Sequence, residues 1–309
     1  MNLLMQLRLG TPVLLVALTL ACYALPHSAP AVNPPPDGDY PDYNTAEGHD
    51  ALFSLHRGYW NTAVGADALY YNTEGHSNTA VGTDALYYNT TGSQNTANGI
   101  DALFSNTTGI NNTATGGWAL SSNTKGQYNT ATGFFALSRS TARFNTADGA
   151  RALESNTTGD LNTAVGGQAL FGNITGSDNT ANGYQALFSN TTGTGNSAFG
   201  RGALFSNTSG SYNIAVGAGA GRNLTTGDRN IDIGSKGVAG EANTIRIGSL
   251  HARAFIAGIS GVAVTGSTIV VDASGQLGVA ASSKRFKEAI KPMDKTSEAL
   301  FSLNPVAFR

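Results

Sequence analysis

The sequence predicts a mainly β protein whose central part is a parallel β-solenoid, or β-roll. A 17-residue unit close to N-T-A-x-G-x-x-A-L-x-x-N-T-T-G-x-x recurs between residues 44 and 248, and a fixed short period is typical of solenoids. The unit leaves no room for a helix of ordinary length. Only 12% of the 309 residues are charged and 39 are Gly, which argues against an ordinary globular enzyme.

Each copy of the repeat begins at an Asn, and the spacing is 17 residues at every step but one. The exception is a 16-residue step from Asn129 to Asn145, and the deletion near residues 139–143 predicts a loop there. About twelve coils stacked at about 4.8 Å each would give a rod of roughly 55–60 Å. The copies begin at Asn44, Asn61, Asn78, Asn95, Asn112, Asn129, Asn145, Asn162, Asn179, Asn196, Asn213 and Asn230.

The ninth position of the unit is Leu in ten copies and supplies the expected core. One Leu and two Ala cannot close a core within one unit, but stacked units would form a continuous apolar column. Disordered low-complexity sequence is the alternative, because Gly, Asn, Ser and Thr favour disorder. The recurrence of Leu at the same repeat position in ten units argues against disorder. The column comprises Leu52, Leu69, Leu86, Leu103, Leu120, Leu137, Leu153, Leu170, Leu187 and Leu204.

The turns of the unit have their own pattern, Asn-Thr-Thr-Gly, which recurs at Asn89, Asn106, Asn156 and Asn190. The Gly permits a positive φ, and the Asn side chain can bond to its own backbone nearby. In a parallel stack, two Asn per coil would form ladders of side-chain amides. We therefore expect buried or half-buried polar groups to be satisfied from one coil to the next.

Residues 1–31 have the features of a secretory signal peptide. Arg8 provides a positive charge, residues 13–21 form a short apolar core, and Ala29-Pro30-Ala31 fits an A-x-A cleavage site. The core is shorter than the roughly 20 apolar residues of a membrane span. A buried helix of the mature fold is the alternative. We expect a protein that is secreted or displayed at the cell surface.

Cys22, the single cysteine, lies in this segment, so we expect no disulfide and no thiolate metal site in the mature chain. It could instead be the lipidated residue of a lipoprotein signal. Residues 18–22 (LTLAC) make a poor lipobox, and we favour secretion without a lipid anchor. Residues 32–43 form a Pro-rich linker with little to bury.

The pattern changes after the solenoid, which we place at residues 44–248. Residues 249–281 are expected to form a short β-stem, in which residues 268–272 (TIVVD) and 276–280 pair as a hairpin. The remaining segment, residues 282–309, begins SSKRFKEAIKPM. It continues with a segment that suits a helix, followed by NPVAFR.

Residues 282–309 resemble the opening of the endosialidase-type intramolecular chaperone, the self-cleaving module that ends phage tail spikes. The opening of that family runs roughly S-[DS]-x-R-[LFY]-K-x-x-I. The helix-like stretch and the final NPVAFR continue the similarity in the same order. The matching residues of the opening are Ser282, Ser283, Arg285, Phe286, Lys287 and Ile290.

The resemblance implies a Ser-Lys dyad in which Ser282 is the nucleophile, Lys287 is the base, and the chain is cut between Ala281 and Ser282. A Lys can act as a base only where desolvation lowers its pKa. The resemblance also implies a homotrimer, whose three chains fold together before the module is removed. The family's module continues further, so we expect a truncated module, at most a single-turnover serine endopeptidase and inactive in this chain. The alternative is the start of a basic amphipathic helix.

The repeats themselves are similar to those of secreted bacterial proteins with tandem N-T-A-x-G-x-x-A-L units. They also resemble the N-x-x-x-x-G repeats in the heads of trimeric autotransporter adhesins, which are parallel β-rolls of three chains. The adhesin unit is shorter than 17 residues, so this likeness extends to the architecture and not to the register.

Two columns of side chains are candidate binding sites. An Asp column occupies one repeat position in the first four coils, where a hard cation such as Ca²⁺ could relieve repulsion between like charges. We favour a solvated face over this weak metal candidate, and we expect the five His to be surface residues because none pairs at metal-ligand spacing. A Thr ladder is the minor candidate, as in ice-binding solenoids. The Asp column comprises Asp50, Asp67, Asp84 and Asp101.

These patterns together predict an exported structural fibre or adhesin-like surface protein that assembles as a homotrimer. The alternative is a single-chain, ligand-binding β-solenoid, for Ca²⁺ or ice, with no proteolytic activity. A formal net charge of −2 without a basic patch gives no reason to expect nucleic acid as a partner. We expect no cofactor, and the sequence does not identify a receptor or host ligand.

Overall fold

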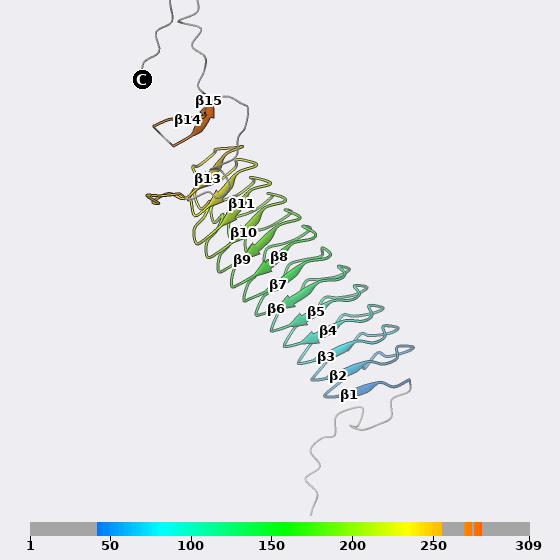
Figure 1. Ribbon diagram of the computed structural model, residues 1–309. Coiled ribbons are helices and arrows are strands. Elements are labelled where there is room, and N and C mark those ends of the chain that lie inside the picture. The colour runs from blue at the N-terminus through cyan, green and yellow to red at the C-terminus, as the bar shows by residue number, and fades with distance from the viewer. Residues whose placement is uncertain (1–41, 255–268, 274, 280–309) are drawn as a thin grey trace, which may run out of the picture. The chain divides into compact units, whose positions relative to one another are not determined.

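The structure is a computed structural model that describes residues 42–254, 269–273 and 275–279. The chain divides into two compact units, Met1–His251 and Ala252–Arg309. The described part of the first unit is a parallel β-solenoid, in which one short strand per coil lies beside the strands of the coils before and after it (Figure 1). The fold class expected from the repeat is therefore confirmed.

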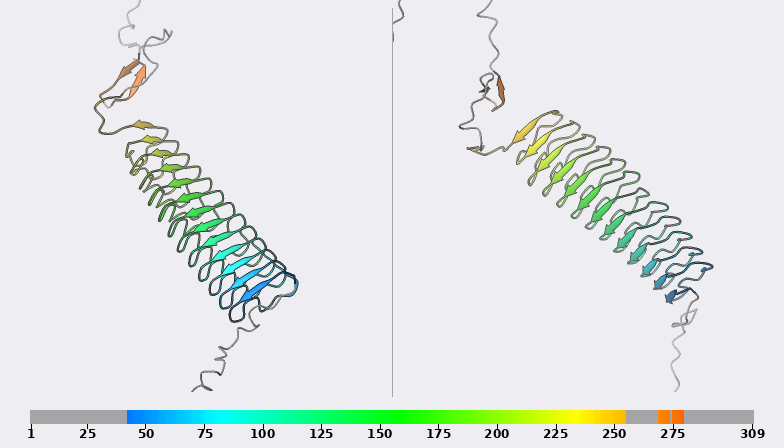
Figure 2. Two further views of the ribbon diagram at one scale, coloured as in Figure 1. Left: turned by 60° about the horizontal axis from the view of Figure 1, so that its bottom comes forward. Right: turned by 45° about the vertical axis from the view of Figure 1, so that its right-hand side comes forward.

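The solenoid sheet has thirteen parallel strands in chain order, and Figure 2 shows them lying one above another on one side of the coils. Residues pair with the equivalent residues of the next coil, as in Ala63 with Ala80. The strands are β1 (Thr45–Glu47), β2 (Thr62–Val64), β3 (Thr79–Val81), β4 (Thr96–Asn98), β5 (Thr113–Thr115), β6 (Thr130–Thr132), β7 (Thr146–Asp148), β8 (Thr163–Val165), β9 (Thr180–Asn182), β10 (Ser197–Phe199), β11 (Ile214–Val216), β12 (Ile231–Ile233) and β13 (Ile245–Ile247).

The Gly two residues after the strand's central residue sets how closely the coils approach. Gly99, for example, has a φ of 138°, which side chains rarely adopt. A Cβ on Gly99 would lie 2.7 Å from the carbonyl carbon of Gly116 in the next coil. The recurrent Gly is therefore required both by backbone conformation and by coil-to-coil contact.

The core is a column of Leu flanked by two columns of Ala, as in Ala114, Ala119 and Leu120, all fully buried. Each Leu of this column has a positive φ, 52° at Leu120. The left-handed conformation costs a non-Gly residue roughly 1–2 kcal/mol, whereas full burial of a Leu side chain contributes about 1.5–3 kcal/mol. Burial thus outweighs the backbone strain only because the neighbouring coils enclose the side chain.

Two ladders of buried Asn run along the solenoid. In the first, the Nδ2 of Asn78 donates to the Oδ1 of Asn61 (3.1 Å) and to the Gly92 carbonyl (2.8 Å). In the second, the Nδ2 of Asn89 donates to the Oδ1 of Asn72 (2.7 Å) and to the same Gly92 carbonyl (2.9 Å). In most coils the two ladders therefore meet at one carbonyl and satisfy polar groups inside the apolar core.

Two substitutions interrupt the second ladder. In the 16-residue coil, Ser140 stands in the Asn position, and the Oδ1 of Asn123 is buried without a hydrogen-bond partner. In the last regular coil, Leu224 stands there, and the Oδ1 of Asn207 is likewise unpartnered. Leu224 is fully buried, and Gly221 stands where the preceding coil has Leu204. In this coil the buried Leu side chain therefore lies in the column of the second Asn ladder and not in the Leu column.

The second unit contains an antiparallel hairpin of β14 (Ile269–Val271) and β15 (Leu277–Val279). This hairpin lies where the β-stem was expected. The segments expected to be a signal peptide (1–31) and a C-terminal module (282–309), and most of the expected linker, lie outside the described residues. None of the residues that the structure describes belongs to a helix long and apolar enough to span a membrane.

Candidate functional site

The catalytic residues expected from the C-terminal resemblance lie outside the described residues. Ala281, Ser282 and Lys287 are among them, so the Ser-Lys dyad and its cleavage site have no described geometry. The surface of the solenoid is therefore where the described residues offer candidate sites. These candidates are the outward face of the sheet, the Asp column and the stacked aromatic rings.

The outward face of the sheet carries a column of Thr. In each strand of sequence Thr-Ala-x, the Ala points inward and is buried, and the residues on either side point outward. Thr occupies the first position from β1 to β9, in register from coil to coil, as in Thr79 with Thr96. The side chains of this column are half-buried or exposed. The sheet therefore presents a regular row of hydroxyl and methyl groups.

The second outward column is less regular. It is Thr in β5 and β6, where Thr115 pairs with Thr132, and these two coils have the T-x-T arrangement. Elsewhere it holds Val, Asn, Phe, Ile and the charged residues Glu47 and Asp148. An array of paired Thr thus extends over two coils, whereas the single Thr column extends over nine.

The Asp column lies at a turn after the strand, and its backbone has the left-handed conformation in every coil. Asp50, Asp67, Asp84 and Asp101 have φ values of 53°, 57°, 57° and 55°. The column continues with Trp118, which also has a positive φ. Asp and Asn adopt this region more readily than other non-Gly residues. Backbone conformation alone therefore accounts for Asp here, without a bound cation.

Electrostatic repulsion is nevertheless present along this column. Partial burial raises the pKa of Asp84 above its usual value, and the neighbouring carboxylate of Asp67 raises it further. Burial and Asp84 act in the same way on the pKa of Asp101. No Arg or Lys is an ion-pair partner of these carboxylates in the described part of the chain.

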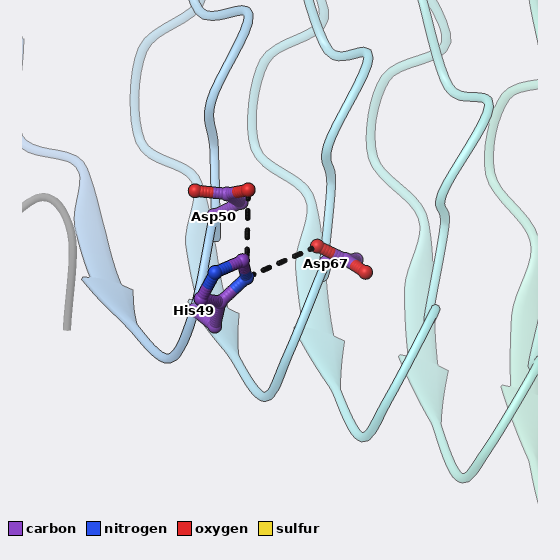
Figure 3. A group of neighbouring side chains, drawn as sticks. All are labelled: His49, Asp50 and Asp67. Atoms are coloured by element: carbon purple, nitrogen blue, oxygen red, sulfur yellow. Dashed lines mark ion pairs between the residues drawn. The ribbon is translucent and has the colours of Figure 1, made fainter.

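One histidine, the surface residue His49, lies beside the start of the column. The Nδ1 of His49 lies 3.4 Å from the Oδ2 of Asp50 and 3.8 Å from the Oδ1 of Asp67 (Figure 3). These three groups could each offer one ligand atom within 4.8 Å of the others. The His49 side chain is 75% exposed, and one nitrogen with two carboxylates suits Ca²⁺ poorly, because Ca²⁺ takes oxygen ligands. The cluster does not establish a metal site.

Aromatic residues of successive coils form stacks on the surface of the solenoid. Tyr70 lies between Phe53 and Tyr87, with ring centroids 5.0 and 5.3 Å away, and Tyr87 stacks on Phe104 at 5.3 Å. A second stack, Phe171, Phe188 and Phe205, has spacings of 5.2 and 5.1 Å. Because the faces of the inner rings are covered by their neighbours, these rings stabilise the stack and do not offer faces to a ligand. Reading the tenth position of each unit would have shown both stacks.

No family model, curated protein or solved structure matches the chain. The fold and the columns of side chains must therefore carry any functional conclusion. A β-solenoid of this kind is compatible with a structural or adhesin-like repeat protein, because its repeated surface is extended and its side chains do not converge on one point.

Proposed function

We propose that this chain is the subunit of an exported structural fibre or adhesin-like surface protein that assembles as a homotrimer. The observation that carries the proposal is the continuous solenoid itself, with its internal Leu column and two Asn ladders. Each coil is held by its neighbours through backbone and amide hydrogen bonds, a design that suits a long, rigid spacer. The signal-like residues 1–31 support export.

The C-terminal similarity supplies the proposed assembly chemistry. In a chain that carries the complete module, the Ser282 hydroxyl adds to the carbonyl carbon of Ala281, and its proton passes to the amine of Lys287. The proton then goes to the departing amino group of Ser282, and water hydrolyses the ester that remains. One peptide bond is broken and one water is consumed, so the reaction needs no cofactor. Release of the module would leave the assembled chains unable to reverse their folding.

The test is the mass of the purified protein, measured intact and by light scattering. The full chain, and the same chain extended to the natural stop codon if the gene continues, are compared with Ser282→Ala and with the matched control Ser283→Ala. A trimeric mass supports the fibre. A fragment ending at Ala281, lost in Ser282→Ala and kept in Ser283→Ala, supports the dyad. An uncut monomer from every form overturns both parts of the proposal.

Ice binding is the second candidate, and the nine-coil Thr column is the observation that favours it. Its outward hydroxyl and methyl groups repeat in register along the sheet. Thermal hysteresis of the purified chain tests this candidate, with Thr113→Lys and Thr130→Lys placed in the middle of the column. Hysteresis that these changes abolish would establish ice binding, and its absence from the unchanged protein would exclude it.

A further inference from the structure

Four tyrosines of two successive coils form a cluster on the surface of the solenoid. Tyr70 and Tyr71 follow β2, and Tyr87 and Tyr88 occupy the equivalent positions after β3. The inner pair, Tyr70 and Tyr87, belongs to the aromatic stack described above, and the outer pair, Tyr71 and Tyr88, lies beside it. Within the described part of the chain, the contacts between two tyrosine rings all occur in this cluster.

The outer pair is parallel, close and accessible to solvent. The ring centroids of Tyr71 and Tyr88 are 5.4 Å apart, and the ring planes differ by 2°. The two residues are 40% and 44% exposed. The same repeat position holds Ser54 in the coil before and Ser105 in the coil after, so the stack of outer rings ends with these two. Two phenols therefore face each other where an oxidant in solution can reach both.

The inner pair is less suited to oxidation. Both faces of each inner ring are covered, because Phe53 and Phe104 close the two ends of the inner stack. Burial, and next the neighbouring Tyr71, raises the pKa of both inner phenols, that of Tyr87 to about 12. A phenol that stays protonated gives up an electron less readily than a phenolate does. The arrangement therefore favours the outer pair as the reactive one.

We propose that Tyr71 and Tyr88 are a site of oxidative cross-linking, where hydrogen peroxide and a peroxidase join the two rings as dityrosine. Each phenol gives one electron and one proton to the oxidant and becomes a phenoxyl radical. The radicals couple through a ring carbon next to each hydroxyl-bearing carbon, and the hydrogen on each coupled carbon moves to the oxygen as the ring becomes aromatic again. The protein loses two hydrogen atoms, and one hydrogen peroxide is reduced to two waters.

The geometry permits this bond without a rearrangement of the backbone. Adjacent parallel strands lie about 4.8 Å apart, and the Tyr71 N–H donates to the Tyr87 carbonyl at 3.0 Å, which fixes the two coils beside each other. The χ2 torsion of a tyrosine is broad, so exposed rings can tilt until two ring carbons meet. Because the rings are already held side by side, coupling within one chain is favoured over coupling between chains.

Such a bond would give the solenoid a covalent staple that a disulfide cannot provide. Cys22 is the single cysteine, so the chain has no second cysteine with which it could pair. A dityrosine bond closes a loop between adjacent coils and reduces the conformational entropy of the unfolded chain, as a disulfide does. Repeat stacks open most readily at their ends, and β2 and β3 follow directly on β1. We therefore expect the bond to resist unfolding of the first coils, whatever the number of chains in the fibre.

The test is oxidation of the folded full chain with hydrogen peroxide and a haem peroxidase. Intact mass, dityrosine fluorescence and peptide mapping give the extent and the position of the cross-link. Tyr71→Phe and Tyr88→Phe keep the rings and remove the reactive hydroxyls. The matched controls are Tyr184→Phe and Tyr212→Phe, which change exposed tyrosines outside the cluster. We expect single chains lighter by two hydrogen atoms and linked between Tyr71 and Tyr88, with the link lost in the first two variants and kept in the controls.

Hydrogen exchange in urea measures the consequence of the cross-link. The oxidised chain should keep protection of β2 and β3 at urea concentrations where the unmodified chain has lost it, and oxidised Tyr71→Phe should behave like the unmodified chain. A link that persists in Tyr71→Phe, or links formed only between chains, would overturn the inference. So would a chain of unchanged mass in a solution where the same oxidant couples free tyrosine. Each of these results leaves the proposed function standing.

Discussion

The Asn ladder allows a comparison of two identical substitutions at equivalent positions, Asn106→Ala and Asn123→Ala. Asn106 takes part in three side-chain hydrogen bonds: its Nδ2 donates to Asn89 and to Gly109, and its Oδ1 accepts from Asn123. Asn123 takes part in two, both as a donor, because its own Oδ1 is buried without a partner. The same truncation therefore removes different numbers of interactions at the two sites.

The expected energies follow from this count. At about 1 kcal/mol net per hydrogen bond, Asn106→Ala loses about 3 kcal/mol and Asn123→Ala about 2 kcal/mol. Asn123→Ala also removes an unpaired buried oxygen, which relieves about 1–3 kcal/mol of desolvation cost. Any cavity term is common to both sites. The free energy of unfolding should consequently fall by about 2–4 kcal/mol more for Asn106→Ala than for Asn123→Ala.

Urea unfolding followed by far-ultraviolet circular dichroism measures this difference. A solenoid can unfold in sections, so the two variants must be compared over the same transition, and hydrogen exchange of the coils around β5 identifies it. Equal destabilisation by the two substitutions, or a larger loss for Asn123→Ala, would refute the reasoning that the amide ladder is satisfied at Asn106 and broken at Ser140.

Other positions give further expectations. Leu120→Ala empties part of a fully buried column and should lower the free energy of unfolding by about 2–5 kcal/mol in the same urea assay. Gly99→Ala places a Cβ against the Gly116 backbone and should abolish hydrogen-exchange protection locally, whereas Gly202→Ala, with nothing within 4 Å of the new Cβ, should cost only about 1–2 kcal/mol. Burial raises the pKa of Asp232 above 3.8, so stability should be highest below the unfolded pKa and should fall as pH rises through the raised folded pKa. Asp232→Ala should remove this loss of stability with rising pH, and should stabilise the solenoid by about 1–3 kcal/mol at neutral pH. Urea midpoints measured across the pH range test both effects. A pH dependence that is the same with and without the substitution would contradict this account.

The solenoid could be predicted because a short period fixes the phase of every side chain. The Leu column and the pairs of Asn recur at the same phase, and stacking is the arrangement that buries both. The breaks could be located from the sequence, at Ser140 and Leu224, but their consequence could not. A buried amide oxygen that lacks a hydrogen-bond partner, such as the Oδ1 of Asn123, can be recognised only when the hydrogen bonds of the fold are known.

The candidate site was less predictable because side-chain direction is not encoded in the period. The neighbours of each Thr in sequence are Asn and Ala, which concealed that Thr and the residue two positions later share the outward face. His49 has no carboxylate at helical or metal-motif spacing, yet stacking brings Asp67 of the next coil to it. The change from Thr to Ile in β11–β13 can be read in the sequence. That these Ile side chains point outward is known only from the structure.

The most direct test of the central claim, that this solenoid is a subunit of a homotrimeric fibre, is the light-scattering mass of the full chain. The account predicts three times the mass of one chain. A mass of one chain for the unchanged protein would contradict the claim and leave a single-chain β-solenoid whose function resides in its outward columns.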